Sequence, residues 1–570
     1  MRSLLLFVLL SLQGAGALAG VANTKHNLSA SGPGNIKSSS EQEICIFCHT
    51  PHNAAPMSPL WNRASSGTVY TPYTSSTLIS SPGQPTGASM LCLSCHDGTV
   101  ALGSVLSRPT DIVMDNGVTT LPPGKTLIGT DLSDDHPVSF DYTSGLASQR
   151  GELVNPDILT GPVKVDRNSQ MQCTSCHDPH NNDNGKFLVM PNTASALCQT
   201  CHVKNFWNES EHKNSTATWN GSPPDPWPNT DVNNVAGNAC ENCHTPHNAG
   251  SDERILNYNV EENNCTPCHN GNVAQYNIEA EFSKFAHHPI EATTGVHDPA
   301  EPGVVNSRHV ECVDCHNPHA ANGSNPLNGV RGINQGGSEV LTVSRTEELC
   351  YRCHGDSNNK PPARTARQIE QTNVRLEFDT ANPSYHPVAG AGKNPNVPSL
   401  LPPLTTSSTI SCLDCHNNDN GPGANGSGAN GPHGSIYEPI LERQYLTSDP
   451  TTESPAAYAL CYKCHDRNSI LGNQSFTRHS LHIQGRGMGG GMYGLSTPCN
   501  VCHDPHGISA TQGNSTNNSK LINFDTSVVS PSRSGRLYYE STGTFSGRCY
   551  LSCHGMNHDP RSYPGGMGGM

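Results

Sequence analysis

Charged and hydrophobic residues are both scarce in this 570-residue chain. Hydrophobic residues make up 34% and charged residues 14%, whereas glycine and proline contribute 54 and 44 residues. This composition alone is typical of a poorly structured chain rather than of conventional globular domains. Beyond residue 19 no apolar run approaches the length of a membrane-spanning helix, which argues against an integral membrane protein.

Unpaired cysteines are absent too. The 24 cysteines form twelve pairs, eleven in C-x-x-C-H and the last in C-x-x-x-C-H. The pairs are Cys45 and Cys48, Cys92 and Cys95, Cys173 and Cys176, Cys198 and Cys201, Cys240 and Cys243, Cys265 and Cys268, Cys312 and Cys315, Cys350 and Cys353, Cys412 and Cys415, Cys461 and Cys464, Cys499 and Cys502, and Cys549 and Cys553. A histidine after every pair argues against tetrahedral zinc, a disulfide scaffold and a thioredoxin-type site, which would occur once.

The same spacing is what covalent haem requires. Two thiols bond the vinyl groups of one porphyrin, and the next histidine ligates the iron. The proximal histidines would be His49, His96, His177, His202, His244, His269, His316, His354, His416, His465, His503 and His554. We therefore expect twelve covalent haems c. In the last motif one of Tyr550, Leu551 and Ser552 must bulge outward.

Haem also reconciles the composition with a fold. Each porphyrin supplies a large apolar surface and two crosslinks, so a loop-rich chain can still enclose a core. We expect a multihaem cytochrome c fold, mostly irregular with short helices, low secondary-structure content and a core formed by stacked haems. Without haem we expect little fold.

The remaining histidines reveal a repeat. Pro-His elements follow the odd-numbered motifs and end in His52, His180, His247, His319, His433 and His506. In the fifth case the insertion NNDNGPGANGSGANG displaces the element without removing it. Another histidine precedes each odd motif: His26, His136, His212, His288, His386, and His482 or His479. One module therefore contains an upstream histidine, C-x-x-C-H-x-P-H and a second C-x-x-C-H.

This repeat predicts the domain organisation. A basic start, an apolar stretch and Ala17-Leu18-Ala19 indicate a signal peptide. The predicted segments are the signal peptide at 1–19, di-haem modules at 23–105, 131–205, 206–275, 280–356, 380–466 and 475–559, and a flexible Gly/Met tail at 560–570.

Six modules require 24 of the 29 histidines, so the count permits two histidines on every iron. A Pro-His histidine lies three residues after a proximal ligand and cannot reach the far face of the same porphyrin, so it must serve another haem. The other haem of its module is the nearest candidate, with the upstream histidine on the first haem; the swapped assignment stays open. Pro-His could instead merely close a turn, but six occurrences in register favour ligation. No role is assigned to His287, His297, His309, His479 or His558.

Short helices should carry several motifs. Capping boxes are predicted at Ser40-x-x-Glu43 and Ser344-x-x-Glu347, and Ser454-Pro455 predicts an N-cap followed by proline. The glycine-rich stretches at 420–434 and 485–494 predict loops and a flexible linker.

The pairing of C-H-x-P-H with C-x-x-C-H resembles the doubled CXXCH motif of multihaem c-type cytochromes from anaerobic, often metal-respiring bacteria. The resemblance covers essentially the whole chain after the predicted signal peptide, with weaker agreement in the fifth and sixth modules. It implies low-potential, bis-histidine haems attached outside the cytoplasm, and electron transfer in the periplasm or at the outer surface. The implied partners are redox proteins, such as other cytochromes or an outer-membrane conduit, or extracellular metal acceptors.

An electron carrier without catalytic residues is therefore expected. The formal charge of −15 disfavours nucleic acid as a partner. One alternative is a multihaem oxidoreductase with one open haem iron, for which the irregular C-terminal motif is the first place to look. Another is a subunit of an extracellular cytochrome filament, which the sequence does not separate from a carrier.

Overall fold

The computed structural model describes residues 20–55, 58, 60–227, 232–290, 310–357, 360–485, 495–511 and 513–564. The predicted signal peptide, His297, His309 and most of the 485–494 stretch lie outside these ranges. The chain divides into two compact units. Unit 1 comprises Met1–Cys268, Thr293–Asp298 and Pro318–Pro326, and unit 2 comprises His269–Ala292, Pro299–Asn317 and Leu327–Met570. The six-module division stays a prediction.

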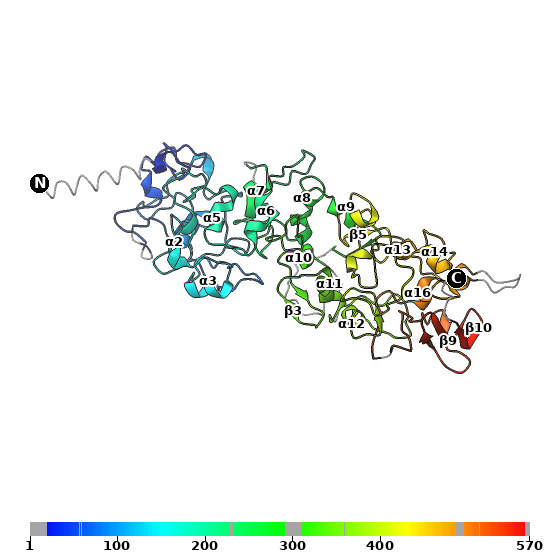
Figure 1. Cartoon of the computed structure of the whole chain (residues 1–570). Coiled ribbons are helices and arrows are strands. Elements are labelled where there is room, and N and C mark those ends of the chain that lie inside the picture. The colour runs from blue at the N-terminus through cyan, green and yellow to red at the C-terminus, as the bar shows by residue number, and fades with distance from the viewer. Residues whose placement is uncertain are drawn as a thin grey trace. The chain divides into compact units, whose positions relative to one another are not determined.

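Short helices joined by loops and turns make up most of both units (Figure 1). The α-helices are α2 (Gly87–His96), α3 (Ser144–Arg150), α4 (Cys173–Cys176), α5 (Ala196–Gln199), α6 (Glu211–Asn214), α7 (Val235–Asn238), α8 (Thr266–His269), α9 (Ile278–Phe282), α10 (Cys312–Cys315), α11 (Thr346–His354), α12 (Val374–Glu377), α13 (Ala459–Tyr462), α14 (Arg467–Leu471), α15 (His479–Gln484) and α16 (Cys499–Cys502). The 3-10 helices are η1 (Cys45–Phe47), η2 (Asp115–Gly117), η3 (Pro156–Ile158), η4 (Thr193–Ser195), η5 (Trp207–Glu209), η6 (Ala239–Asn242), η7 (Glu261–Asn264), η8 (Cys412–Asp414) and η9 (Pro422–Ala424). The predicted fold class, with short helices and little regular structure, is confirmed.

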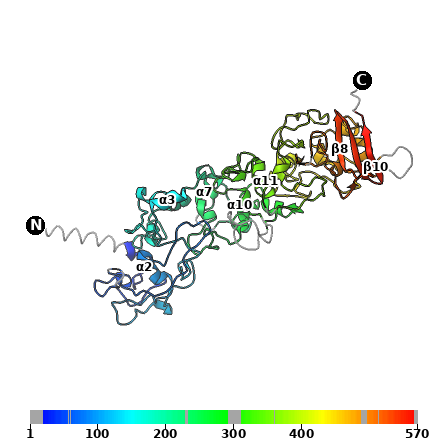
Figure 2. The same ribbon diagram turned by 90° about the horizontal axis from the view of Figure 1, so that it is seen from below.

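Strands are few, and all the pairs are antiparallel. They are β1 (Ala286–His287), β2 (Gly332–Ile333), β3 (Glu339–Val340), β4 (Ser384–Tyr385), β5 (Gly434–Ser435), β6 (Gly507–Ile508), β7 (Val529–Ser530), β8 (Tyr538–Gly543), β9 (Ser546–Cys553) and β10 (Met556–Tyr563). Three two-stranded sheets pair β1 with β5, β2 with β3, and β4 with β6. At the C-terminal end of unit 2, β9 pairs with β7, β8 and β10, and Figure 2 shows this sheet.

One predicted capping box is displaced by a residue. The carboxylate of Glu348, not Glu347, accepts hydrogen bonds from the backbone N–H groups of Ser344 and Arg345, at 2.7 and 3.1 Å. Helix α11 therefore begins one residue later than the prediction implies.

The other two predicted helix starts are also imprecise. Ser454 accepts a hydrogen bond from the N–H of Ala457 at 3.0 Å, but turns intervene before α13 begins. Near Ser40 the carboxylate of Glu41 accepts from the N–H of Glu43, and only the 3-10 turn η1 follows.

Buried apolar residues gather in several small clusters rather than in one core. Five of the six clusters include cysteines of the haem motifs. These cysteines are Cys201, then Cys502, Cys549 and Cys553, then Cys48 and Cys95, then Cys412, and finally Cys461 and Cys499. The apolar packing is therefore centred on the cysteine motifs.

Candidate functional site

Histidine rings face one another in eleven pairs within the described residues, with centroids 6.0 to 6.5 Å apart. The pairs are His26 with His96, His49 with His180, His136 with His202, His177 with His247, His244 with His319, His288 with His354, His316 with His433, His386 with His465, His416 with His506, His479 with His503, and His482 with His558. Each pair lies within one of the two units.

The separation fits a metal ion held between two imidazoles. A ligating nitrogen lies about 2 Å from its metal and the ring centre about 1.2 Å farther, so two rings on opposite sides of one ion are about 6.4 Å apart. The interplanar angles range from 7° to 77° while the separation hardly changes. Ring stacking therefore does not set the distance, and the pairs fit two axial ligands of a haem iron.

The second ring nitrogen is used in a way that supports this assignment. Nδ1 of His96 lies 2.8 Å from the carbonyl oxygen of Thr126, and Nδ1 of His177 lies 2.9 Å from that of Lys186. Because a carbonyl only accepts, Nδ1 carries the proton and Nε2 keeps a free lone pair, as metal-ligating histidines require. Burial also lowers the pKa of His202 to about 3, which keeps that imidazole neutral.

Upstream histidines face the second motif of their own module, not the first as the nearest assignment supposed. The four clear cases are His26 with His96, His136 with His202, His288 with His354, and His386 with His465. In the last module His482 faces His558, which lies four residues beyond the second motif. The swapped assignment is therefore the better one for the upstream histidines.

Pro-His histidines face the first motif of the preceding module. The five cases are His180 with His49, His247 with His177, His319 with His244, His433 with His316, and His506 with His416. The expectation that each would serve the second haem of its own module is wrong for these five, because the element reaches back across the module boundary. Consecutive modules are thereby interlocked.

The proline of each of these five Pro-His elements also contacts the preceding module, and we call this contact region between two modules a junction. Its carbonyl accepts a hydrogen bond from the upstream histidine of the preceding module. Nδ1 of His26, His212, His288 and His386 bonds to Pro179, Pro318, Pro432 and Pro505, and the backbone N–H of His136 bonds to Pro246. The proline carbonyl thus orients an upstream ligand while the next residue supplies another.

Two junctions in unit 2 each contain a short antiparallel strand pair. β1 precedes His288 and pairs with β5, and β4 precedes His386 and pairs with β6. A Cβ on Gly434 or Gly507 would come within 1.8 or 2.0 Å of a buried backbone carbonyl, so only glycine fits. The repeated Asn-x-x-x-Glu-Phe before each upstream histidine, at 277–282 and 373–378, is the signal that the sequence analysis missed.

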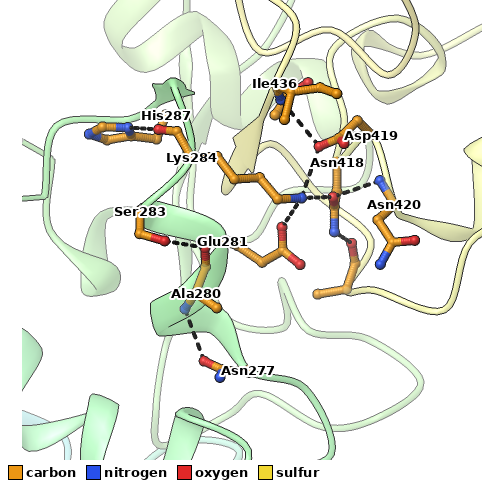
Figure 3. A network of polar contacts seen from close by, with 12 residues as sticks. Asn277, Ala280, Glu281, Ser283, Lys284, His287, Asn418, Asp419, Asn420 and Ile436 are labelled. Carbon is orange, nitrogen blue, oxygen red and sulfur yellow. Dashed lines mark hydrogen bonds and ion pairs between the residues drawn. The ribbon is translucent and has the colours of Figure 1, made fainter.

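The insertion in the fifth module is an ordered loop. Asn417 and Asn418 are buried, and they bond to the N–H of Gly431 and the carbonyl of Ala429, at 2.7 and 2.9 Å. Figure 3 shows Lys284 bridging to this loop, where its ammonium donates to Asn418 and to Asp419, at 2.7 and 2.8 Å. These contacts present His433 to His316 at 6.0 Å, as in the uninterrupted modules.

Within each unit, attachment cysteines of neighbouring motifs lie close together in space. Within modules the second cysteines of the two motifs lie near each other, as for Cys48 and Cys95: burial, with a smaller contribution from the nearby Cys95, raises the pKa of the Cys48 thiol to about 12. Between modules the first cysteines lie close enough in space to shift each other's pKa: Cys92 and Cys173, Cys198 and Cys240, Cys350 and Cys412, and Cys461 and Cys499. Matching serine contacts hold two of these sites, since the amides of Cys173 and Cys240 donate to Ser89 and Ser195 at 3.1 and 3.0 Å.

Two Pro-His histidines are backed by carboxylates instead of carbonyls. Nδ1 of His247 lies 2.9 Å from Asp135, and Nδ1 of His506 lies 2.8 Å from Glu377. Burial alone lowers the pKa of His506, but the charge of Glu377 outweighs it and raises the pKa to about 9. Both carboxylates are buried, and a carboxylate behind a ligating imidazole raises its basicity as an iron ligand.

Two predicted ligands, His52 and His554, are placed differently. His52 is exposed, and no histidine ring pairs with it in the described part of the chain. His212 resembles the other upstream histidines, since its Nδ1 lies 2.8 Å from the carbonyl oxygen of Pro318, and His269 is the last residue of helix α8. His554 contacts Asp449 rather than another histidine.

His558, which the sequence analysis left without a role, faces His482, and His479, which it gave only as the alternative to His482, faces His503. The spacing of His479 and His482, three residues apart, was the available signal for two ligands on one helix face.

Known proteins share these motifs. Residues 162–205 match the family of the doubled CXXCH motif, and residues 232–384 match domains II/IV of MtrC/MtrF-like outer membrane cytochromes. The multiheme cytochrome MtrA of Shewanella baltica is 26% identical over 197 residues, which cover 33% of this chain and 43% of that relative. The chain is a multihaem c-type cytochrome.

The cysteine motifs and the matching proteins support covalent binding of haem c. The matched segment of this cytochrome spans less than half the length of the MtrA relative. None of its described helices is both long enough and apolar enough to cross a membrane.

Proposed function

We propose that this cytochrome carries twelve covalent haems c and relays electrons along them in chain order. Haem iron accepts and releases one electron, and two histidines keep it six-coordinate in both states. The observation that carries the proposal is the interlocking of eleven histidine pairs, in which the Pro-His elements bind each module to the one before it. No residue receives a catalytic role.

The chain's own residues hold the attachment sites together. Carbonyl and carboxylate partners fix the imidazole planes, so little rearrangement accompanies a change of charge. Hydrogen bonds from the backbone keep successive motifs adjacent at two module boundaries, where the amides of Cys173 and Cys240 donate to Ser89 and Ser195. For the sixth motif, the register of the repeat assigns His212 to the haem of Cys265 and Cys268.

We place the protein outside the cytoplasm, in the periplasm or at the outer surface, during anaerobic respiration. The predicted signal peptide and the outer-membrane and Mtr names of the matching proteins support this. Its partners would be other cytochromes, an outer-membrane conduit or extracellular metal acceptors.

Haem counting and carbon monoxide binding test the proposal. Intact mass and a pyridine haemochrome assay should both give twelve haems, and eight or fewer would refute the modular scheme. The reduced protein should bind almost no carbon monoxide at neutral pH, because tethered imidazoles occupy the sixth positions at high effective concentration. Rapid binding at one haem, with a high-spin ferric signal, would favour an oxidoreductase.

A further inference from the structure

His554, which follows the C-terminal cysteine pair, does not occupy the position of an iron ligand. His554 and Gly555 form the turn between β9 and β10, with φ of 50° and 76°, as in the two-residue turns that close hairpins. Nε2 of His554 lies 2.6 Å from a carboxylate oxygen of Asp449. In His96 and His177 it is Nδ1 that makes the hydrogen bond, so His554 alone among these commits the nitrogen that would bind iron.

His558 lies where a ligand for this motif is needed. Residues 549, 551 and 553 alternate along β9 and therefore share one face of the strand. The register places His558 directly opposite Leu551, so its side chain lies on the same face as Cys549 and Cys553. The wider C-x-x-x-C spacing suits an extended strand, because cysteines four residues apart then point to one side.

His482 completes the pair from helix α15. Its ring centroid lies 6.4 Å from that of His558, and its Nδ1 lies 2.8 Å from the carbonyl oxygen of Arg478. Phe476 stacks on His482 at 5.6 Å and meets Tyr563 of β10 at 4.4 Å, which fixes the helix against the sheet. The geometry matches the ten other pairs.

We propose that His558 and His482, not His554, ligate the iron of the haem attached at Cys549 and Cys553. This assignment rests on the twelve-haem function proposed above. Helix α15 then supplies a ligand to each haem of the last module, since His479 faces His503 in the place that a following Pro-His element takes elsewhere. With His482 and His558 as its two ligands, this iron has no open coordination position, although the irregular motif had made it the candidate for one.

Matched asparagine variants of the full-length holoprotein test the assignment. Asparagine tolerates the positive φ at residue 554, so His554→Asn preserves the hairpin turn, and residue 558 lies within β10 outside that turn. His558→Asn should convert one haem in twelve to high spin and bind one carbon monoxide per molecule, and free imidazole should restore low spin. His554→Asn should leave every haem low-spin. A high-spin haem in the His554 variant, or none in the His558 variant, overturns the assignment.

A methionine variant covers the case in which His558→Asn loses its haem. His558→Met should retain twelve haems and raise the reduction potential of one of them, since methionine in place of histidine raises it. Unchanged potentials would count against the assignment. A wild-type mass with eleven haems would overturn both proposals, whereas twelve haems with the wrong variant pattern would overturn only this one.

Discussion

His180→Ala tests the interlocking of modules most directly. His180 faces His49, so its removal should leave the haem of Cys45 and Cys48 five-coordinate. The His180 side chain is 52% exposed, and its pair with Asp178 is a surface contact worth about 0–1 kcal/mol, so the fold should persist. About one haem in twelve should become high-spin, and the reduced protein should bind one carbon monoxide. His52→Ala, the same position of the first module, is the matched control and should change neither signal.

A methionine in place of His49, the residue that faces His180, identifies which haem loses a ligand in the His180 variant. His49→Met should give a haem with methionine and histidine ligands, recognised by its methionine-to-iron charge-transfer band and raised potential. Adding His180→Ala should abolish that band if the two side chains share one iron. If the band survives the second substitution, or if His52→Ala opens a haem, the module junction has been misassigned.

Three further predictions concern the groups around the histidine pairs. Glu377→Gln should raise the reduction potential of one haem, because it removes the buried negative charge beside His506. Unchanged midpoint potentials in spectroelectrochemistry would show that this carboxylate does not affect the potential of the iron. Lys284→Met should lower the free energy of unfolding by about 1–3 kcal/mol in denaturant titrations, because Glu281 and Asn418 lose a charged hydrogen-bond donor. An unchanged free energy of unfolding would mean that the Lys284 contacts do not stabilise the fold. Arg63→Lys should lower the free energy of unfolding by at least about 2 kcal/mol in denaturant titrations. The fully buried guanidinium donates hydrogen bonds to five backbone carbonyls, whereas an ammonium offers only three donors. Wild-type stability of this variant would contradict the reasoning.

The attachment chemistry and the repeat are readable in the sequence because they are local. Two thiols and a histidine serve one porphyrin within five consecutive residues, so the eleven regular motifs need no tertiary information. The same holds for the low secondary-structure content, which follows from scarce apolar residues and abundant glycine and proline. Even the insertion before His433 could be recognised as displacing a ligand rather than deleting it.

The pairing of ligands was decided only by the tertiary structure. Axial ligation joins residues far apart in the chain, such as His49 and His180, and the histidine count fits several assignments equally well. Adjacency in sequence also misleads at the C-terminus, where a hairpin turn directs His554 to Asp449 and strand register brings His558 to the cysteine face. Local spacing determines what can be attached, whereas the path of the backbone determines which side chains meet across the metal.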